Sequence, residues 1–304
     1  MGSLKVYATV AGFLALASSV SAVQAADLLP PPPPPPAPVE PIADVGGGWY
    51  LRGDVGVGQY STGKISNPGD ATLAYTNKDF GSSVFVGAGI GYQFNSWFRA
   101  DLTGEYRMSN DWRFNDRGSW YTDNGTSKWN STSNERTSMG HRAAVFLANG
   151  YFDLGNWYGI TPFIGGGVGF ANHMLKGGNT DTLNVFGPFY DSASGAVLNG
   201  GALQTGVSGG TLANRNQTNF AWALHAGLAY DIAPNLKLEL AYRYLNMGSV
   251  TTGTVNCYCY SVYPGFKVKN VDSHDVKLGL RWAFGGGAPV AAPAYEPAPL
   301  MRKY

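Results

Sequence analysis

The chain has 304 residues, a net charge of +1 at pH 7 and 13% charged residues, about half the share usual in soluble domains. Glycine occupies 42 positions and aromatic residues make up 13% of the chain, which favours many strands and turns over a soluble helical enzyme. The near-zero net charge gives nucleic acid no electrostatic attraction, so we expect no nucleic acid among the partners. A mean hydropathy of -0.13 excludes a helical membrane bundle but not a β-barrel, whose strands show lipid only every second residue.

The N-terminus has the pattern of a secretory signal peptide. Lys5 supplies a short positive region, and residues 6–20 are apolar or small, a stretch too short for a spanning helix. Ala22, Val23 and Ala25 provide a small-residue cleavage site. We therefore predict a signal peptide over residues 1–25, cleaved after Ala25, and an exported mature protein.

Proline dominates the segment that follows. Residues 30–36 are an unbroken proline run, which adopts an extended polyproline II conformation and acts as a stiff spacer. The sequence thus predicts a proline-rich periplasmic linker over residues 26–47. A second flexible tail, rich in Gly, Ala and Pro, is expected in the periplasm over residues 285–304.

Between these tails, apolar and polar residues alternate with a period of two, the signature of β-strands. About ten residues per segment is the length that crosses a bilayer at a tilt. The segments comprise residues 49–59, 83–94, 97–108, 141–153, 160–171, 220–232, 236–245 and 273–284. They predict an all-β fold, an eight-stranded antiparallel transmembrane β-barrel over residues 48–284.

The connections between the segments fall into two classes. Those after residues 94, 153 and 232 are short, whereas residues 60–82, 109–140, 172–219 and 246–272 form long polar connections. Short periplasmic turns and long external loops are typical of outer-membrane barrels. An even strand number then places both termini in the periplasm. Residues 172–219 leave room for a further hairpin, which would give ten strands.

The two faces of the segments predict which residues point to lipid. Aromatic residues gather at the segment ends, as membrane interfaces favour, which argues against a soluble barrel with its apolar face inside. Charged residues of both signs share the opposite face and are assigned to the interior with His225: Arg52, Asp54, Arg99, Asp101, Glu105, Arg107, Asp153, Asp231, Lys237, Glu239, Arg243, Asp275, Lys277 and Arg281. Buried charges need partners, so we expect ion pairs to fill the lumen. The alternative is a narrow or gated conduction path.

The long connection 109–140 interleaves aromatic and basic residues, among them Trp112, Trp120 and Arg113. One interpretation is a contact site for glycan, lipopolysaccharide or another ligand. The interpretation we favour is a pair of strands that extend above the membrane with packed aromatic side chains.

The two cysteines, Cys257 and Cys259, would meet an oxidising compartment after export. The alternatives are loop cysteines without chemistry, a local disulfide or an intermolecular disulfide. Metal binding has the least support because His141, His173, His225 and His274 show no metal-site spacing. We expect neither a metal nor a cofactor.

Two motif matches carry little weight. Residues 87–91 have the glycine pattern of a dinucleotide loop, but they lie within a strand that no helix follows. Ser273, His274 and Asp275 are the residue types of a catalytic triad, yet neighbours on a strand point to opposite faces. We therefore predict no enzymatic activity and no catalytic residues.

Three segments together resemble one protein family. Residues 48–54 (GWYLRGD), the stretch from 152–155 (FDLG) to 160–163 (ITPF), and the closing residues 276–284 are similar to alphaproteobacterial outer-membrane proteins of the OmpA-like or opacity type, often called the porin family. The resemblance implies an eight-strand barrel in the outer membrane, with roles in envelope integrity and surface interaction, sometimes as a surface antigen. Trp282 and Phe284 would then form the signal read by the barrel assembly machinery, although here a tail follows Phe284.

Some members of similar families are joined to peptidoglycan through an N-terminal Ala-Asp. Ala26 and Asp27, followed by the proline spacer, fit that arrangement, and a plain linker is the alternative.

The expected function is a non-enzymatic barrel with a structural, envelope-integrity and surface-display role. Alternatives are a narrow porin-like diffusion channel and a lipid-modifying barrel enzyme. Expected partners are outer-membrane lipid, lipopolysaccharide, the barrel assembly machinery and peptidoglycan; the oligomeric state is left open.

Overall fold

The computed structural model describes residues 47–61, 63–69 and 73–284. Within them nearly all regular structure is β-strand, so the all-β prediction is confirmed. The predicted signal peptide, nearly all of the linker, Ala26, Asp27 and the tail 285–304 lie outside the described residues and stay predictions. Among the described residues, no helix has the length and apolar character needed to cross a membrane.

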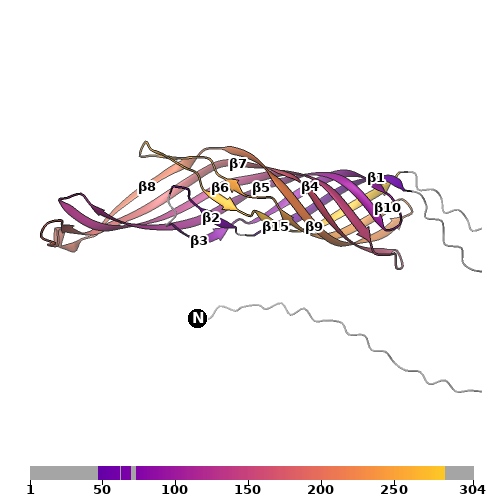
Figure 1. Cartoon of the computed structure of the whole chain (residues 1–304), viewed down its shortest axis with the longest axis horizontal. Coiled ribbons are helices and arrows are strands. Elements are labelled where there is room, and N and C mark those ends of the chain that lie inside the picture. Colours follow the sequence, from indigo (N-terminus) through magenta and orange to yellow (C-terminus); the bar gives the residue numbers. More distant parts are fainter. Residues whose placement is uncertain (1–46, 62, 70–72, 285–304) are drawn as a thin grey trace, which may run out of the picture. The chain divides into compact units, whose positions relative to one another are not determined.

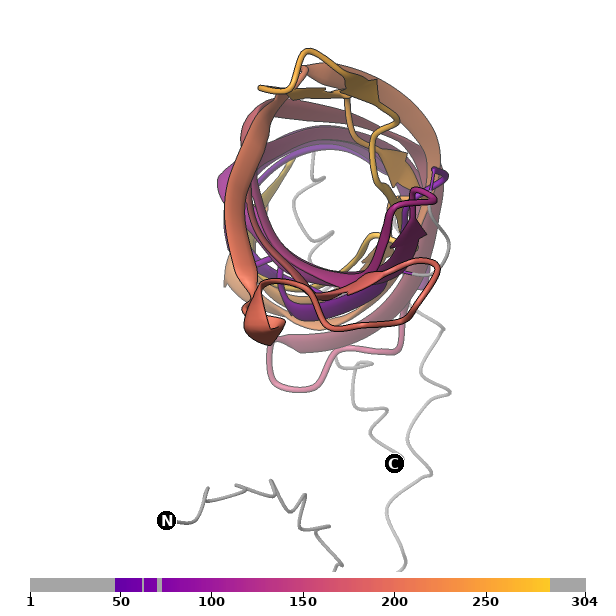
Figure 2. The ribbon, with the colours of Figure 1, turned by 90° about the vertical axis from the view of Figure 1, so that its left-hand side faces the viewer.

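Eight long strands form the body of the molecule (Figure 1). They are β1 (Gly48–Tyr60), β4 (Ser82–Gln93), β5 (Phe98–Asp123), β6 (Ser127–Asp153), β7 (Ile160–Asp191), β9 (Arg215–Ala233), β10 (Leu236–Asn246) and β15 (Asp272–Ala283). Each is paired antiparallel with the next, and β15 is paired with β1, so the pairings return to their start. Figure 2 shows the resulting ring end-on.

Shorter strands occupy the connections at one end of the ring. They are β2 (Lys64–Ser66), β3 (Ala74–Asp79), β8 (Gln204–Leu212), β11 (Val250–Thr251), β12 (Val255–Cys257), β13 (Val262–Tyr263) and β14 (Lys267–Lys269), with one 3-10 turn, η1 (Asn199–Gly201). A separate small sheet has the order β11-β14-β2. The connections at the other end contain no strands and are short.

Residues 109–140 and 172–219, predicted as long polar connections, consist largely of β-strand. Strands β5 and β6 continue as a paired ribbon as far as Asp123 and Lys128, and β7 continues beside β6 to Asp191 (Figure 1). The favoured interpretation of residues 109–140, two strands extended beyond the ring, matches this geometry. Strand β8 pairs with the extension of β7 and with β12, so the further hairpin lies outside the ring.

An irregularity in β5 changes which residues face inward. The pairing of β5 with β6 shifts between Arg107 and Asn110. Before the shift the buried residues have odd numbers, such as Arg99 and Arg107, and after it they have even numbers, such as Trp112 and Phe114. A β-bulge of this kind re-aims every later side chain of its strand. Strict alternation along the sequence therefore assigns the wrong face to the second half of β5.

Candidate functional site

A cluster of buried ion pairs fills the ring near the end with the short connections. Arg52 contacts Asp101 at 2.9 Å and Glu239 at 3.1 Å, and Glu239 is also contacted by Arg281 at 3.0 Å and by Arg99 at 3.4 Å. These residues come from four strands, β1, β5, β10 and β15. The remaining members of this first cluster are Asp54, Asp153 and Lys277. Four basic side chains thus face four acidic ones, and the cluster is neutral.

A second cluster lies further along the ring. Arg107 donates to Asp275 through Nη2 at 2.8 Å and through Nη1 at 3.0 Å. Arg243 contacts Asp275 at 2.6 Å and Glu105 at 2.8 Å, and Arg107 contacts Glu105 at 3.2 Å. This second cluster balances two positive charges with two negative ones. Paired and hydrogen-bonded in this way, the buried charges avoid the cost of desolvation without a partner.

Four further polar residues complete the network, and one of them, His225, was predicted to lie inside. Tyr50 donates to Asp101 at 3.1 Å, and Tyr151 accepts from Arg52 at 3.3 Å. Asn149 donates to Asp101 at 2.8 Å, and Nε2 of His225 lies 3.2 Å from Oδ1 of Asn149. The inward tyrosines were missed because aromatic residues were assigned to the lipid face. The signal that marks them is strand alternation itself, because Tyr50 lies two positions before Arg52 and Tyr151 two positions before Asp153.

Two predicted interior residues lie at the rim of the ring. Asp231 and Lys237 form an ion pair of 2.6 Å, but each side chain is about one-third exposed, at 33% and 32%. They flank the short turn between β9 and β10. Both share the inward face of their strands with the buried Ala229 and Glu239, but at the strand ends the ring opens to solvent and the two side chains pair locally.

An apolar layer lies beyond the second cluster. Arg107 donates from Nε to the hydroxyl of Tyr60, and that tyrosine belongs to a cluster of buried apolar side chains. Trp112 stacks on Phe80 and on His141 with ring centroids 4.7 and 4.1 Å apart. Other members of this layer are Ile65, Phe114, Met139, Leu175, Leu245, Met247, Val250, Phe266, Val268 and Val271. Packed side chains therefore fill the interior above the charged clusters.

Two histidines within this layer are hydrogen-bonded to each other. Nε2 of His141 lies 2.9 Å from Nδ1 of His173, and Nε2 of His173 lies 3.0 Å from the carbonyl oxygen of Met247. His274, by contrast, lies on the outer face and is bonded to Tyr242. Among the described residues there is no group of three or more His, Cys, Asp or Glu side chains that could hold a metal ion.

The triad residue types at positions 273–275 separate as strand geometry requires. Ser273 donates to Asp275 at 2.5 Å inside the ring. His274 lies on the opposite face and does not approach this serine. The three residues therefore do not form a Ser-His-Asp arrangement.

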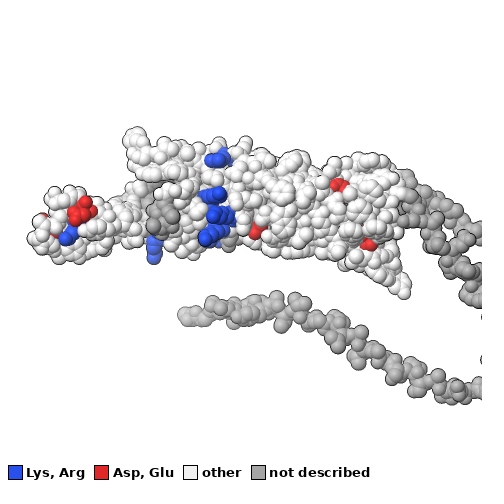
Figure 3. Space-filling model, viewed as in Figure 1, with Lys and Arg blue, Asp and Glu red and all other residues white. Residues whose placement is uncertain are grey.

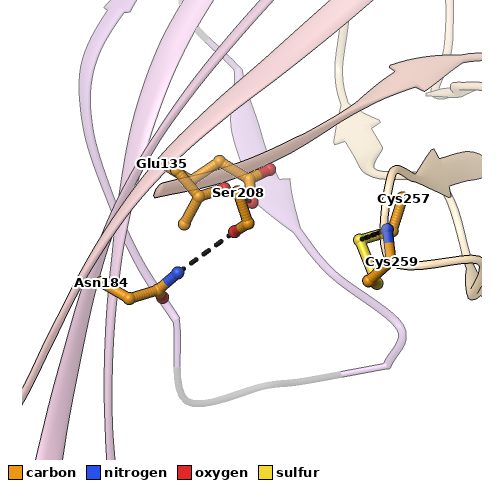
Figure 4. The surroundings of a disulfide bond; sticks show 6 residues. Glu135, Asn184, Ser208, Cys257 and Cys259 are labelled. Carbon is orange, nitrogen blue, oxygen red and sulfur yellow. Dashed lines mark hydrogen bonds between the residues drawn. A yellow bond between two sulfur atoms is a disulfide. The ribbon is translucent and has the colours of Figure 1, made fainter. Parts of the chain in front are cut away.

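A partly enclosed cavity of about 570 Å³ lies above the apolar layer. Its walls come from the extensions of β5, β6 and β7, from β8, and from the segments around β2 and β12–β13. Figure 4 shows part of it: Asn184 donates to Ser208 at 3.1 Å, and Glu135 and the Cys257–Cys259 disulfide lie nearby. The disulfide joins residues two positions apart and lines the cavity.

The carboxyl group of Glu135 accepts two hydrogen bonds in the cavity wall. Thr182 donates to one carboxyl oxygen at 3.0 Å, and Thr137 donates to the other at 3.4 Å. Burial raises the pKa of Glu135 above its ordinary value, while these two hydroxyl donors act in the opposite direction.

Comparison with known proteins places the chain in a family. The model of the outer membrane protein beta-barrel domain matches residues 13–284. The chain belongs to this family. An uncharacterised protein of Brucella abortus is 31% identical over 295 residues, covering 88% of this chain and 95% of that protein. A Rickettsia prowazekii protein with the printed name "Putative adhesin RP828" is 27% identical, covering 77% of this chain and 86% of that protein.

Solved structures similar to this outer membrane β-barrel protein are distant in sequence. OprG from Pseudomonas aeruginosa has a TM-score of 0.41 at 14% identity and covers 79% of this chain and 97% of its own. Neisserial surface protein A has a TM-score of 0.36 at 17% identity and covers 79% and 99%. At these values neither neighbour carries information on function.

The outer surface of the β-barrel is apolar where the strands of the ring face outward. Leu51, Val55 and Val57 of β1 are exposed, and so are Leu278 and Leu280 of β15. Exposed aromatic residues occur at one end of the strands, namely Trp49, Phe94, Trp97, Phe152, Trp157, Trp282 and Phe284, and at the other end, namely Tyr106, Phe146, Phe170, Phe220 and Tyr242. Figure 3 shows a largely uncharged surface with lysine and arginine residues gathered at one level.

The end of β15 is attached to the start of β1. Phe284 donates its backbone N–H to the carbonyl of Trp49 at 2.8 Å, and its ring lies 4.7 Å from that of Trp282. Both side chains are exposed on the outer surface. The prediction that they are read by the barrel assembly machinery is compatible with this position and stays a prediction.

Proposed function

We propose that this chain is an eight-stranded barrel that crosses the bacterial outer membrane, is closed to solutes, and displays a β-structured extension outside the cell. The observation that carries the proposal is the inverted distribution of polarity over the ring. Apolar side chains face outward along all eight strands, while ion pairs fill the inside. Lipid is the solvent that suits such an exterior.

The orientation follows from the lengths of the connections. Short turns are typical of the periplasmic end and long connections of the external end, so the extensions of β5, β6 and β7 would project from the cell. Both ends of the chain would then lie in the periplasm, where the predicted linker and a peptidoglycan attachment at Ala26 would be of use. The names of the Rickettsia relatives support a surface role for this extension.

We propose that a group of three exposed lysine side chains near the external end binds lipid phosphate groups. Lys64 of β2 is paired with Lys269 of β14, and Lys267 lies on the same face two positions away. All three side chains are exposed, at the proposed external end. Ammonium groups placed there would attract the phosphates of lipopolysaccharide. Replacing the three lysines with glutamine should lower the phosphate that copurifies with the protein, whereas Lys128→Gln at the tip of β6 should not.

A closed, non-enzymatic role has more support than the two alternatives. A narrow diffusion channel would need a continuous aqueous path, but two neutral ion-pair clusters and an apolar layer follow one another inside the ring. A lipid-modifying enzyme would need a nucleophile beside a histidine on the lipid face, and His274 is bonded there to a tyrosine.

Labelling of single cysteines on intact cells tests the orientation. We would introduce Ser194→Cys at the tip of the extension and Asn235→Cys in the β9–β10 turn, in a Cys257→Ser, Cys259→Ser background, and apply a membrane-impermeant maleimide. We expect labelling at 194 on intact cells and at 235 only after the membrane is broken. Labelling at 235 but not at 194 would overturn the proposed orientation, and labelling at both would overturn the barrel as a membrane-spanning element.

A further inference from the structure

The cavity above the apolar layer has the size of a small-ligand site. Its volume of about 570 Å³ lies within the range of about 300–1,000 Å³ that is usual for ligand pockets. Phe266 and Val255 belong both to the apolar cluster and to the cavity lining, so the cavity ends on packed side chains and does not continue as a channel. A molecule that enters it therefore meets a blind, shaped site.

The polar side of the cavity is a row of hydroxyl and amide groups on adjacent strands. Glu135 of β6 is paired with Thr182 of β7, and that threonine is paired with Ser208 of β8. Asn184 and Ser133 also line the cavity and are paired with each other, two positions along β7 and β6 from Thr182 and Glu135. A hydroxyl or an amide both donates and accepts hydrogen bonds, so this row offers both to a ligand that carries several hydroxyl groups.

The carboxyl group of Glu135 is part of this polar row. Because burial raises its pKa, the carboxyl keeps its proton over a wider pH range than an exposed glutamate. A protonated carboxyl donates one hydrogen bond and accepts others, as an amide does. In either protonation state its carboxyl oxygens can accept hydrogen bonds from the hydroxyl groups of a ligand.

Aromatic side chains also line the cavity. Trp120, Tyr263 and Phe266 line it, and no lysine or arginine is among the described residues of its wall. Aromatic faces suit the C–H surface of a sugar ring. An anionic ligand would find no positive partner within this wall.

We propose that this cavity binds a neutral saccharide of one or two sugar rings, held by the hydroxyl and amide row and by Trp120 on the adjacent strand β5. The site goes beyond the proposed display function. It depends on that function only for the side of the membrane on which the cavity opens, because binding to the purified chain does not require an orientation.

Calorimetric titration of the full chain tests the proposal. The protein is kept in lauryldimethylamine oxide micelles, since maltoside and glucoside detergents carry sugars. The neutral probes are maltose, cellobiose and diacetylchitobiose, and glucuronate and 1,4-diaminobutane serve as the anionic and cationic probes. We expect saturable binding of at least one neutral disaccharide and weaker or no binding of the two charged probes.

Matched variants locate the site. Trp120→Ala should weaken binding of the neutral probe about tenfold, whereas Tyr121→Ala removes the next aromatic residue, which does not line the cavity, and should leave binding unchanged. Glu135→Ala should weaken binding and Glu135→Gln should retain it. Heat-dependent gel migration confirms that each variant is folded.

Three results would overturn the proposal: no binding of any neutral probe, preference for glucuronate or diaminobutane, or equal binding by Trp120→Ala and Tyr121→Ala. None of them would affect heat-dependent migration or labelling at position 194. A failure of the saccharide site is therefore distinguishable from a failure of the proposed function.

Discussion

Arg107 and Asp275 lie 168 positions apart in the chain and meet inside the ring through two hydrogen bonds, of 2.8 and 3.0 Å. One residue comes from β5 and the other from β15, strands that are not neighbours in the ring. The pair therefore ties opposite parts of the wall together across the interior. Arg243 shares the same carboxylate, so Asp275 balances two guanidinium groups with the help of Glu105.

Removing the carboxylate of Asp275 should destabilise the protein strongly. Asp275→Ala leaves the buried Arg107 and Arg243 with only Glu105 as an acidic partner, and loss of one partner of a buried pair costs about 3–5 kcal/mol. The free energy of unfolding, measured by urea titration in lipid vesicles with tryptophan fluorescence, checks the expected loss.

Asp111→Ala is the matched control for that substitution. Asp111 pairs with Arg113 at 3.0 Å, but the two side chains are 63% and 51% exposed. An exposed ion pair contributes about 0–1 kcal/mol, so this variant should unfold almost as the parent does. Equal losses in the two variants would contradict the assignment of Asp275 to a buried network.

Gly58 makes room for the same ion pair. A Cβ atom at this position would lie 1.9 Å from Nη2 of Arg107 and 2.1 Å from Oδ1 of Asp275. Gly58→Ala should therefore displace the pair and lower the free energy of unfolding by about 1–3 kcal/mol, the usual cost of overpacking. Gly53→Ala on the same strand is the control, because a Cβ there meets nothing within 4 Å. A loss at position 53 equal to that at position 58 would contradict this explanation.

The inward-facing residues in the second half of β5 could not be predicted from the sequence. Residues up to Arg107 alternate regularly, and their faces follow from the pattern alone. The shift before Asn110 then turns Trp112 and Phe114 inward; Ser109, Asn110 and Asp111 favour an irregularity there but do not say that the strand continues beyond it on the other parity. A bulge is set by how β5 pairs with β6, which the sequence of one strand does not reveal.

The external connections were harder still to predict. The aromatic residues interleaved in residues 109–140 indicated two extended strands, but not that β5 and β6 pair over almost their whole length or that β7 and β8 join them. Their stability comes from backbone pairing and from the interior aromatic residues, contacts distant in sequence. The cavity is the product of such contacts, since its wall joins residues as distant as Asn67 and Phe266.

The raised pKa of Glu135 predicts a pH dependence of the extension. A carboxyl with a higher pKa in the folded state binds its proton more tightly there, so its protonation adds stability at low pH. That contribution is complete below the ordinary pKa of glutamate, about 4.3, and is lost as the pH rises through the raised folded value. Proteolysis of the extension should be slower on the acidic side of this window.

Glu135→Gln provides the comparison. The amide keeps the shape and the acceptor oxygen but does not titrate, so the part of the pH dependence that Glu135 supplies should disappear. An identical pH profile in parent and variant would show that another group is responsible.

The central claim is that the lumen is sealed by its own side chains, and conductance measures this most directly. The purified full chain is reconstituted into planar bilayers at 1 M potassium chloride, with heat-dependent gel migration of the same sample as the check that the barrel is folded. We predict folded protein that inserts without discrete conductance steps. Reproducible steps that scale with salt concentration, from protein that shows the heat shift, would contradict a sealed lumen and establish a conduction path through the interior charges.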